Sequence, residues 1–173
     1  FPTRRSSDLI HGIIEFGNRL LTFVLIAIAI VMFVLVLRIR RERRDLFVLA
    51  LVIGLGIPAQ GVIGGFSVLT NLNPYVVGLH FVLSVVLVVL STLLVYRVYA
   101  GPRGVRASVP LWYSALTHAT SALVAITILV GIITTGSGPH AGDSGASRNG
   151  LDSDLLQHVH SWPAYATVAA TVL

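Results

Sequence analysis

Long apolar runs alternate with short polar segments along most of the chain. The first run, residues 20–37, has 18 residues without a charge, which is about the length that crosses a bilayer at ~1.5 Å per helical residue. Three further runs, at residues 46–66, 76–99 and 111–135, are at least as long, and a fifth begins near Leu155. Runs of this length predict membrane-spanning helices. We therefore expect an all-α, polytopic transmembrane helical bundle.

The two ends of the sequence depart from this pattern. Residues 10–20, IHGIIEFGNRL, extend the first predicted helix to the membrane surface, whereas residues 1–9, FPTRRSSDL, do not continue it. We interpret residues 1–9 as a non-native scar. The last residue, Leu173, lies within the fifth apolar run, so we expect the sequence to be an internal fragment of a longer protein.

Arginine is concentrated in two of the loops between the apolar runs. Residues 38–45, RIRRERRD, hold five Arg against two acids, and residues 97–106 hold Arg97, Arg103 and Arg106 without an acid. Short loops rich in Arg stay in the cytoplasm. We therefore expect loops 38–45 and 97–106 to be cytoplasmic and loops 67–75 and 136–154 to be extracytoplasmic, in the cell membrane.

Composition agrees with the pattern and excludes other classes of protein. With 55% hydrophobic and 11% charged residues, the chain is too apolar for a soluble domain. Its formal net charge of +5 comes from Arg that is concentrated in loops, so we interpret the charge as a topology signal and expect no nucleic-acid partner. Cysteine is absent, which excludes a disulfide or a thiolate metal site in this stretch.

The predicted topology brings polar side chains to one depth, at the outer ends of the helices. At this depth lie Glu15, Asn18 and Arg19 on the first helix, His80 on the third, and His158 and His160 on the fifth. Each set, apart from His158, belongs to a longer stripe on one face of its helix: His11, Glu15, Asn18, Arg19 and Thr22; His80, Ser84 and Ser91; and His160, Thr167 and Thr171, with Ala164 between them. Polar stripes on membrane helices face the interior of the bundle. Histidines that face inward from separate helices suit heme iron, because neutral imidazole nitrogen is an apt iron ligand.

Simpler interpretations stay open for these positions. Histidines near a membrane surface, such as His80, His158 and His160, are also typical interfacial polar residues, and Glu15 with Arg19 has the spacing of an ion pair along a helix. We interpret His118 as an interhelical hydrogen-bonding residue, and His11 and His140 as solvated. The glycines at 61, 64 and 65 indicate close helix packing, since no strand precedes them as in a phosphate loop.

Several strings resemble one known family. IEFGNRLLT, QGVIGGFSVLTNLNPYVVGLHF, TGSGPHAGD, RNGLD and LLQHVHSWPAY are similar, in order and spacing, to heme A synthase of the actinobacterial type, and the resemblance covers Ile10 to Leu173. It implies eight transmembrane helices in two four-helix halves, of which the five here look like helices two to six. Residues 10–135 would be the substrate-heme half without its first helix, residues 136–154 an extracytoplasmic loop, and residues 155–173 the start of the heme b half.

The resemblance also implies an activity and its residues. The family oxidises the methyl group of heme O to the formyl group of heme A, with heme b as cofactor, for terminal oxidase assembly. By position, Glu15 matches an acid beside the substrate heme, His80 a histidine facing the substrate iron, and His160 the first axial ligand of heme b; the second ligand would lie on the eighth helix. Expected partners are heme O, membrane lipid, heme O synthase, an electron acceptor and a second copy of the chain.

The sequence departs from the family at Asn18, where a second heme-facing histidine is common. Asn is a poor iron ligand, so we expect His80 alone to hold the substrate iron, with Asn18 and Arg19 beside it. Arg19 or Arg148 would pair with the heme propionates. The main alternative is a non-catalytic diheme b-type electron-transfer subunit, which needs no acid at Glu15. A transporter comes last, because no broken helix is evident.

Overall fold

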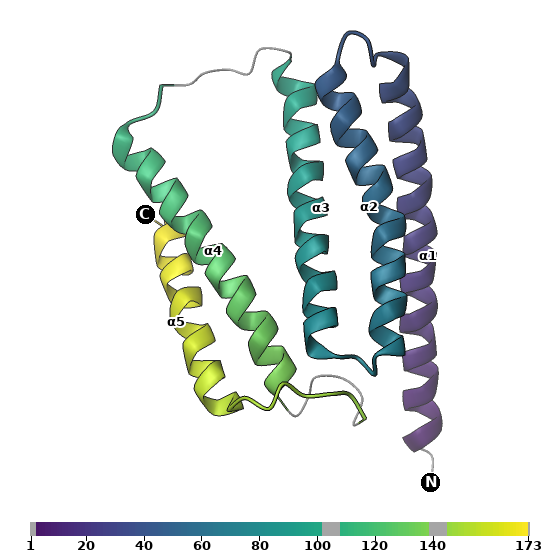
Figure 1. Ribbon diagram of the computed structural model, residues 1–173, viewed down its shortest axis with the longest axis vertical. Helices are drawn as coiled ribbons and strands as arrows, with labels where there is room; N and C mark the ends of the chain where they lie inside the picture. Colours follow the sequence, from purple (N-terminus) through teal and green to yellow (C-terminus); the bar gives the residue numbers. More distant parts are fainter. Residues whose placement is uncertain (1–2, 102–107, 139–144, 173) are drawn as a thin grey trace. The chain divides into compact units, whose positions relative to one another are not determined.

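The computed structural model of the chain describes residues 3–101, 108–138 and 145–172, with the backbone alone at residues 3–12, 14, 15, 18 and 19. These residues form five helices and no strand (Figure 1). The helices are α1 (Thr3–Arg38), α2 (Arg44–Leu69), α3 (Pro74–Ala100), α4 (Leu111–Ser137) and α5 (Ser153–Val172). The prediction of an all-α fold is confirmed, and each predicted apolar run lies within one helix.

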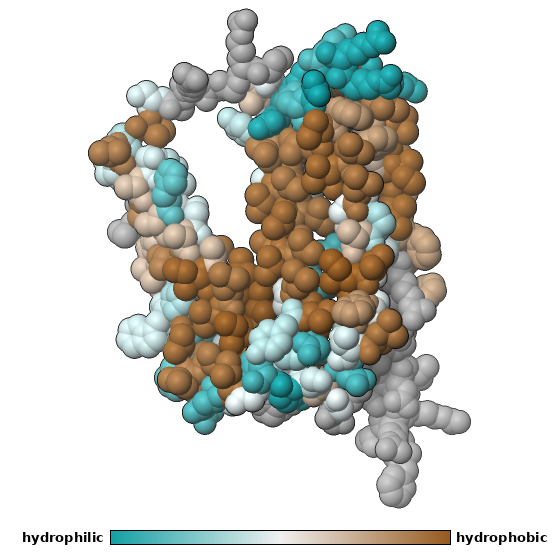
Figure 2. All heavy atoms as spheres, in the orientation of Figure 1, coloured by the Kyte–Doolittle hydropathy of each residue, from teal (hydrophilic) through white to brown (hydrophobic). Residues whose placement is uncertain are grey.

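Four of these helices are long and apolar enough to cross a membrane: α2, α3 and α4 over their whole lengths, and α1 over Leu20–Arg38. Their apolar side chains are largely exposed, for example Phe23 (68%), Val62 (73%) and Val88 (65%). Figure 2 shows this hydrophobic surface on the helices, with hydrophilic residues gathered over the loop between α1 and α2. Such an area would be unfavourable in water and suits contact with lipid.

Short polar residues fix where two of the helices begin. Asn73 Oδ1 accepts a hydrogen bond from the amide of Tyr75 at 3.0 Å, and Pro74 occupies the first helical position of α3, where its missing N–H is no loss. Asp152 Oδ1 accepts from the amides of Asp154 and Leu155 at 2.9 and 3.3 Å and starts α5 in the same way. These caps define the ends of the two loops predicted to be extracytoplasmic.

The chain divides into two compact units, and α2 and α3 contribute to both. The first unit contains α1, α2 as far as Ala59 and α3 from Leu87 onward; the second contains α2 from Gln60, α3 as far as Val86, and α4 and α5. The core of the first unit is a cluster of buried apolar side chains from three helices: Val36, Leu46, Leu49, Ala50, Ile53 and Leu94. This packing joins α1, α2 and α3 at the ends that carry the arginine-rich loops.

Arg43 connects the loop after α1 to the end of α3 within the first unit. Its Nη2 donates a hydrogen bond to the backbone oxygen of Arg97 at 2.8 Å, while Nε and Nη2 donate to the two carboxylate oxygens of Asp45 at 3.1 and 3.2 Å. The Arg97 oxygen is one of the last carbonyls of α3, which have no partner within the helix and favour a cation. Arg43 therefore holds residues 38–45 against the start of the 97–106 loop.

The turn between α2 and α3 belongs to the second unit and is tightly wound. Asn71 and Leu72 have φ of 52° and 54°, the left-handed region that bulky side chains rarely adopt. The amide of Leu72 donates to Ser67 O at 2.8 Å, and the amide of Ser147 donates to Asn71 O at 3.1 Å. The second bond ties the loop of residues 67–75 to the loop of residues 136–154.

Two predictions about segments stay predictions. Helix α1 begins at Thr3 and so includes most of residues 1–9, which does not test whether they are native. The division at residues 135 and 154 is not tested by the structure either. Residues 10–135 include the helices α1 to α4, whereas a four-helix half without its first helix would have three helices, so the boundary at residue 135 does not agree with a count of helices two to six. Arg103, Arg106, His140 and Asp143 lie outside the described residues.

Candidate functional site

His80 lies on the first half of α3 and packs against α2. A Cβ atom built on Gly64 of α2 would lie 3.3 Å from Cε1 of the His80 ring and 3.7 Å from Nδ1. The residue is half-buried, and its Nδ1 is buried without a hydrogen-bond partner among the described residues. A neutral imidazole carries one donor and one acceptor nitrogen, so the His80 ring has a bonding capacity that no described residue uses.

Gln60 fixes the backbone beside His80 by crossing from α2 to α3. Its Nε2 donates to the backbone oxygen of His80 at 3.2 Å and to Ser84 Oγ at 2.7 Å. Ser84 Oγ in turn donates to the same His80 oxygen at 2.9 Å. Gln60 Oε1 is buried and has no partner among the described residues. Polar groups inside a membrane bundle are costly unless they are hydrogen-bonded, and these bonds offset that cost for Gln60 Nε2 and the Ser84 hydroxyl.

His160 lies on α5 and packs against α4, which runs beside α5 in the second unit (Figure 1). A Cβ atom built on Gly131 of α4 would lie 2.8 Å from Cε1 of the His160 ring. Like His80, His160 is half-buried and has a buried Nδ1 without a partner among the described residues. The bond from Thr134 Oγ1 to Leu156 O, 3.2 Å long, holds α4 and α5 together one turn away.

A cavity borders His160 within the second unit. It lies between the first half of α3 and the second half of α4. Its volume of about 560 Å³ is within the usual range of cofactor sites, roughly 300–1,000 Å³. Its walls are mainly apolar, and its lining includes Leu72, Val77, Phe81, Ile128, Ile132 and His160. Such walls suit a flat apolar ring system, with the imidazole as a polar group at one side.

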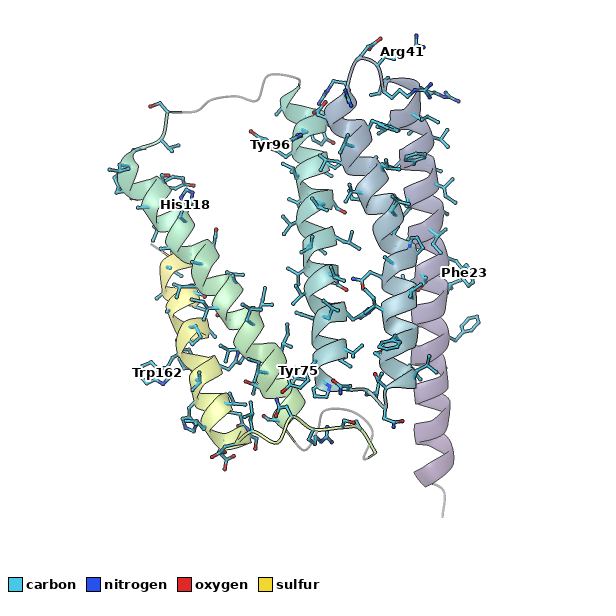
Figure 3. All side chains as sticks on the ribbon, in the orientation of Figure 1. Phe23, Arg41, Tyr75, Tyr96, His118 and Trp162 are labelled. Carbon is cyan, nitrogen blue, oxygen red and sulfur yellow. The ribbon has the colours of Figure 1, made fainter. Side chains whose placement is uncertain are left out.

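The other histidines of the described helices have different surroundings. His158 is exposed, and its Nδ1 lies 2.8 Å from the backbone oxygen of Asp154 on its own helix. His118 is also exposed, with Nδ1 2.6 Å from Ser114 O of α4, so its one described bond lies within a helix and not between helices. Figure 3 shows Trp162 pointing away from α5; its side chain is 74% exposed. His160 is therefore half-buried, whereas its neighbours in sequence His158 and Trp162 are exposed.

Glu15, Asn18 and Arg19 belong to the helical backbone of α1, but their side chains, like that of His11, lie outside the described residues. Arg148 is half-buried in the segment before α5. In the part of the chain that the structure describes, no three His, Asp or Glu side chains come together as a metal site.

Two contacts of the histidines were not predicted from the sequence. Gln60 is a lone amide in an apolar helix, and that isolation is a signal for a functional position. Gly131 had no such signal, because a glycine in an apolar run is typical of membrane helices. Of the three glycines expected in close packing, Gly64 faces His80, whereas Cβ atoms on Gly61 and Gly65 would meet no described atom within 4 Å.

Fold and site together define a class: a multi-pass helical membrane protein with half-buried histidines on two separate helices, one of which, His160, borders an apolar cavity. A comparison with known families is more specific. The model of the cytochrome oxidase assembly protein family (COX15-CtaA) matches residues 6–142, and the chain belongs to this family, that of the heme A synthases. Its general role is therefore in cytochrome oxidase assembly and heme A synthesis. No curated protein and no solved structure gave a significant match to the chain.

Proposed function

We propose that the protein is a heme A synthase, an oxidoreductase that converts the methyl group of heme O to the formyl group of heme A with heme b as cofactor. The observation that carries the proposal is the family membership over residues 6–142. That stretch includes Glu15 and His80, the two residues to which the proposal assigns the substrate. The product would serve the assembly of a heme A-containing terminal oxidase.

The surroundings of the two histidines fit this assignment. His80 and His160 each present a half-buried imidazole with a ring nitrogen that lacks a partner among the described residues, and neutral imidazole is a common iron ligand. We assign His80 to the iron of the substrate heme and His160 to the iron of heme b. Heme b, when bound, supplies the redox chemistry. The apolar walls near His160 would shield a bound ring from water.

Glu15 is assigned the proton chemistry at the substrate. A carboxylate next to the heme edge can accept a proton from the methyl carbon or stabilise positive charge that develops there. Arg19 or Arg148 is assigned to the propionates, because guanidinium pairs well with carboxylate. Because asparagine is a poor iron ligand, His80 is the residue of this chain that we assign to the substrate iron, and Asn18 is not. These roles follow the family pattern, and the side chains of Glu15, Asn18 and Arg19 lie outside the described residues.

We also propose an orientation in the cell membrane, with loops 38–45 and 97–106 in the cytoplasm and loops 67–75 and 136–154 outside. The bond between Arg43 and the Arg97 oxygen supports the first pairing, because it holds both arginine-rich loops at one end of the first unit. The bond between Ser147 and Asn71 supports the second pairing in the second unit. Heme O, delivered by heme O synthase, would then enter from lipid. An electron acceptor would reoxidise the cofactor. The protein would act as a monomer or as a homo-oligomer.

The test is to identify the hemes in membranes of a host that makes heme O and expresses the intact gene. We expect heme A with the parent protein and none with Glu15→Gln or His80→Ala. Matched controls are Glu42→Gln, an acid in the arginine-rich loop, and His158→Ala, an exposed histidine; both should still yield heme A. If the parent yields heme b and heme O but no heme A, the protein is an electron-transfer subunit and the proposal is wrong.

A further inference from the structure

Each of the two half-buried histidines lies against a glycine of a neighbouring helix. His160 on α5 faces Gly131 on α4, and His80 on α3 faces Gly64 on α2; built Cβ atoms would lie 2.8 and 3.3 Å from the respective Cε1 atoms. Real Cβ atoms essentially never approach another atom as closely as the first distance, and the second distance is shorter than in most real Cβ contacts. Each ring therefore occupies the space that any larger residue at the glycine would need.

An added methyl group would displace the ring and not the helix. At Gly131, the three nearest atoms to a built Cβ are Cε1, Nδ1 and Nε2 of His160, at 2.8, 3.3 and 3.6 Å. All three belong to the far end of a side chain that turns about two bonds, whereas at Gly136 the nearest atom would be Cβ of Pro74, at 2.6 Å. A clash at Gly131 is thus relieved by rotation of the imidazole.

We propose that Gly131 is a positioning residue that sets the direction of the His160 ring, and that Gly64 does the same, less strictly, for His80. The inference rests on the proposed function for the ligand, heme iron, but its steric part does not need the ligand. An imidazole binds iron along one direction in its ring plane, and groups that orient a metal ligand typically change metal affinity by about 10–100-fold. The absence of a side chain at these glycines gives the rings their orientation.

The first test compares glycine variants of the intact protein, purified in detergent. Gly131→Ala should lower the affinity for heme b by roughly 10–100-fold, which is seen as a lower heme content per protein, and the electron paramagnetic resonance spectrum of the remaining ferric heme should shift. Gly56→Ala is the packing control, since its Cβ would meet the Leu87 side chain and no histidine, and neither residue lines the cavity; it should lower thermal stability but leave the spectrum unchanged. Gly65→Ala, next to Gly64 and without a described atom within 4 Å, should leave the spectrum unchanged and should not lower thermal stability, because Ala favours a helix over Gly.

The second test separates the orientation of the ring from a general need for glycine. Gly131→Ala is made in the parent and in His160→Ala, and thermal unfolding is measured for all four proteins. Because Ala favours a helix over Gly, the methyl group should raise the midpoint in His160→Ala, where the ring is gone. In the parent it should raise the midpoint less or lower it, because the ring has to turn away and the two sites share this contact. An equal shift of the midpoint in both backgrounds would overturn the proposal.

The two tests keep this proposal apart from the proposed function. If the parent protein retains no heme, the assignment of heme b to His160 fails, while the thermal cycle still decides whether Gly131 orients the ring. If the parent retains heme b and Gly131→Ala changes neither heme content nor spectrum, the positioning role fails and the assignment of His160 stands.

Discussion

Arg43 allows a quantitative prediction about the stability of the first unit. In Arg43→Ala, the Arg97 oxygen loses its 2.8 Å bond to Nη2, and Asp45 loses a two-point partner. The change also removes one positive charge from the arginine-rich loop. Arg41, which is exposed on the same loop (Figure 3), is a matched control, because Arg41→Ala removes the same charge without breaking a described bond.

The size of the effect follows from the two contacts. A hydrogen bond from a charged group contributes about 1.5–3 kcal/mol. The pair with Asp45 adds less, about 0.2–1 kcal/mol, since the two side chains are 15% and 35% exposed. Asp45 is also close in sequence, so part of that contact persists after unfolding. We expect Arg43→Ala to lower the free energy of unfolding by about 2 kcal/mol, or roughly 4–8 °C in midpoint for a chain of this size.

The measurement is thermal unfolding of the purified proteins in one detergent. Arg41→Ala should stay within about 0.5 kcal/mol of the parent, as exposed substitutions usually do. Arg43→Lys should fall between the parent and Arg43→Ala, because an ammonium keeps the charge but cannot bond in the two-point geometry of guanidinium. Equal losses in Arg41→Ala and Arg43→Ala would mean that loop charge, and not the bond to α3, determines stability, and the reasoning would be refuted.

Three further predictions concern the second unit and the orientation. Asn73→Ala should lower the unfolding free energy by about 1 kcal/mol through loss of the α3 cap; an unchanged midpoint in thermal unfolding would contradict it. Gln60→Leu and Ser84→Ala should show a coupling of about 0.6 kcal/mol in a double-mutant cycle, the average for hydrogen bonds between membrane helices, and additive losses would argue against the bond. Because the chain has no Cys, Arg41→Cys and Leu151→Cys report sidedness: in intact cells an impermeant thiol reagent should label only Leu151→Cys, and the reverse result would invert the orientation.

The helices were predictable from sequence because one physical term dominates them. A backbone in hydrocarbon must satisfy its hydrogen bonds internally, so an uncharged run of sufficient length has few alternatives to a helix. The runs at residues 46–66 and 76–99 accordingly lie inside α2 and α3. The caps at Asn73 and Asp152 were not assigned beforehand, although both residues are typical of helix starts.

The partners of the candidate site residues were less predictable. The stripe of His80, Ser84 and Ser91 was expected to face the interior, yet Ser91 is exposed and bonds to Leu87 O of its own helix. A serine hydroxyl can donate its hydrogen bond to a backbone oxygen of the preceding turn of its own helix. A polar stripe therefore does not by itself specify which face of a helix packs against its neighbours. Which glycine lies under which histidine depends on helix rotation and register, and these arise from packing that a single sequence does not display.

The left-handed backbone at Leu72 affects the balance between stability and function in this protein. A bulky residue at φ 54° costs of order 1–3 kcal/mol, and glycine would adopt the same conformation without strain. The Leu72 side chain, however, forms part of the cavity that borders His160. Variants selected only for heat resistance should therefore accumulate Leu72→Gly, whereas selection for heme A production should retain an apolar side chain, since natural sequences commonly sacrifice stability at working sites.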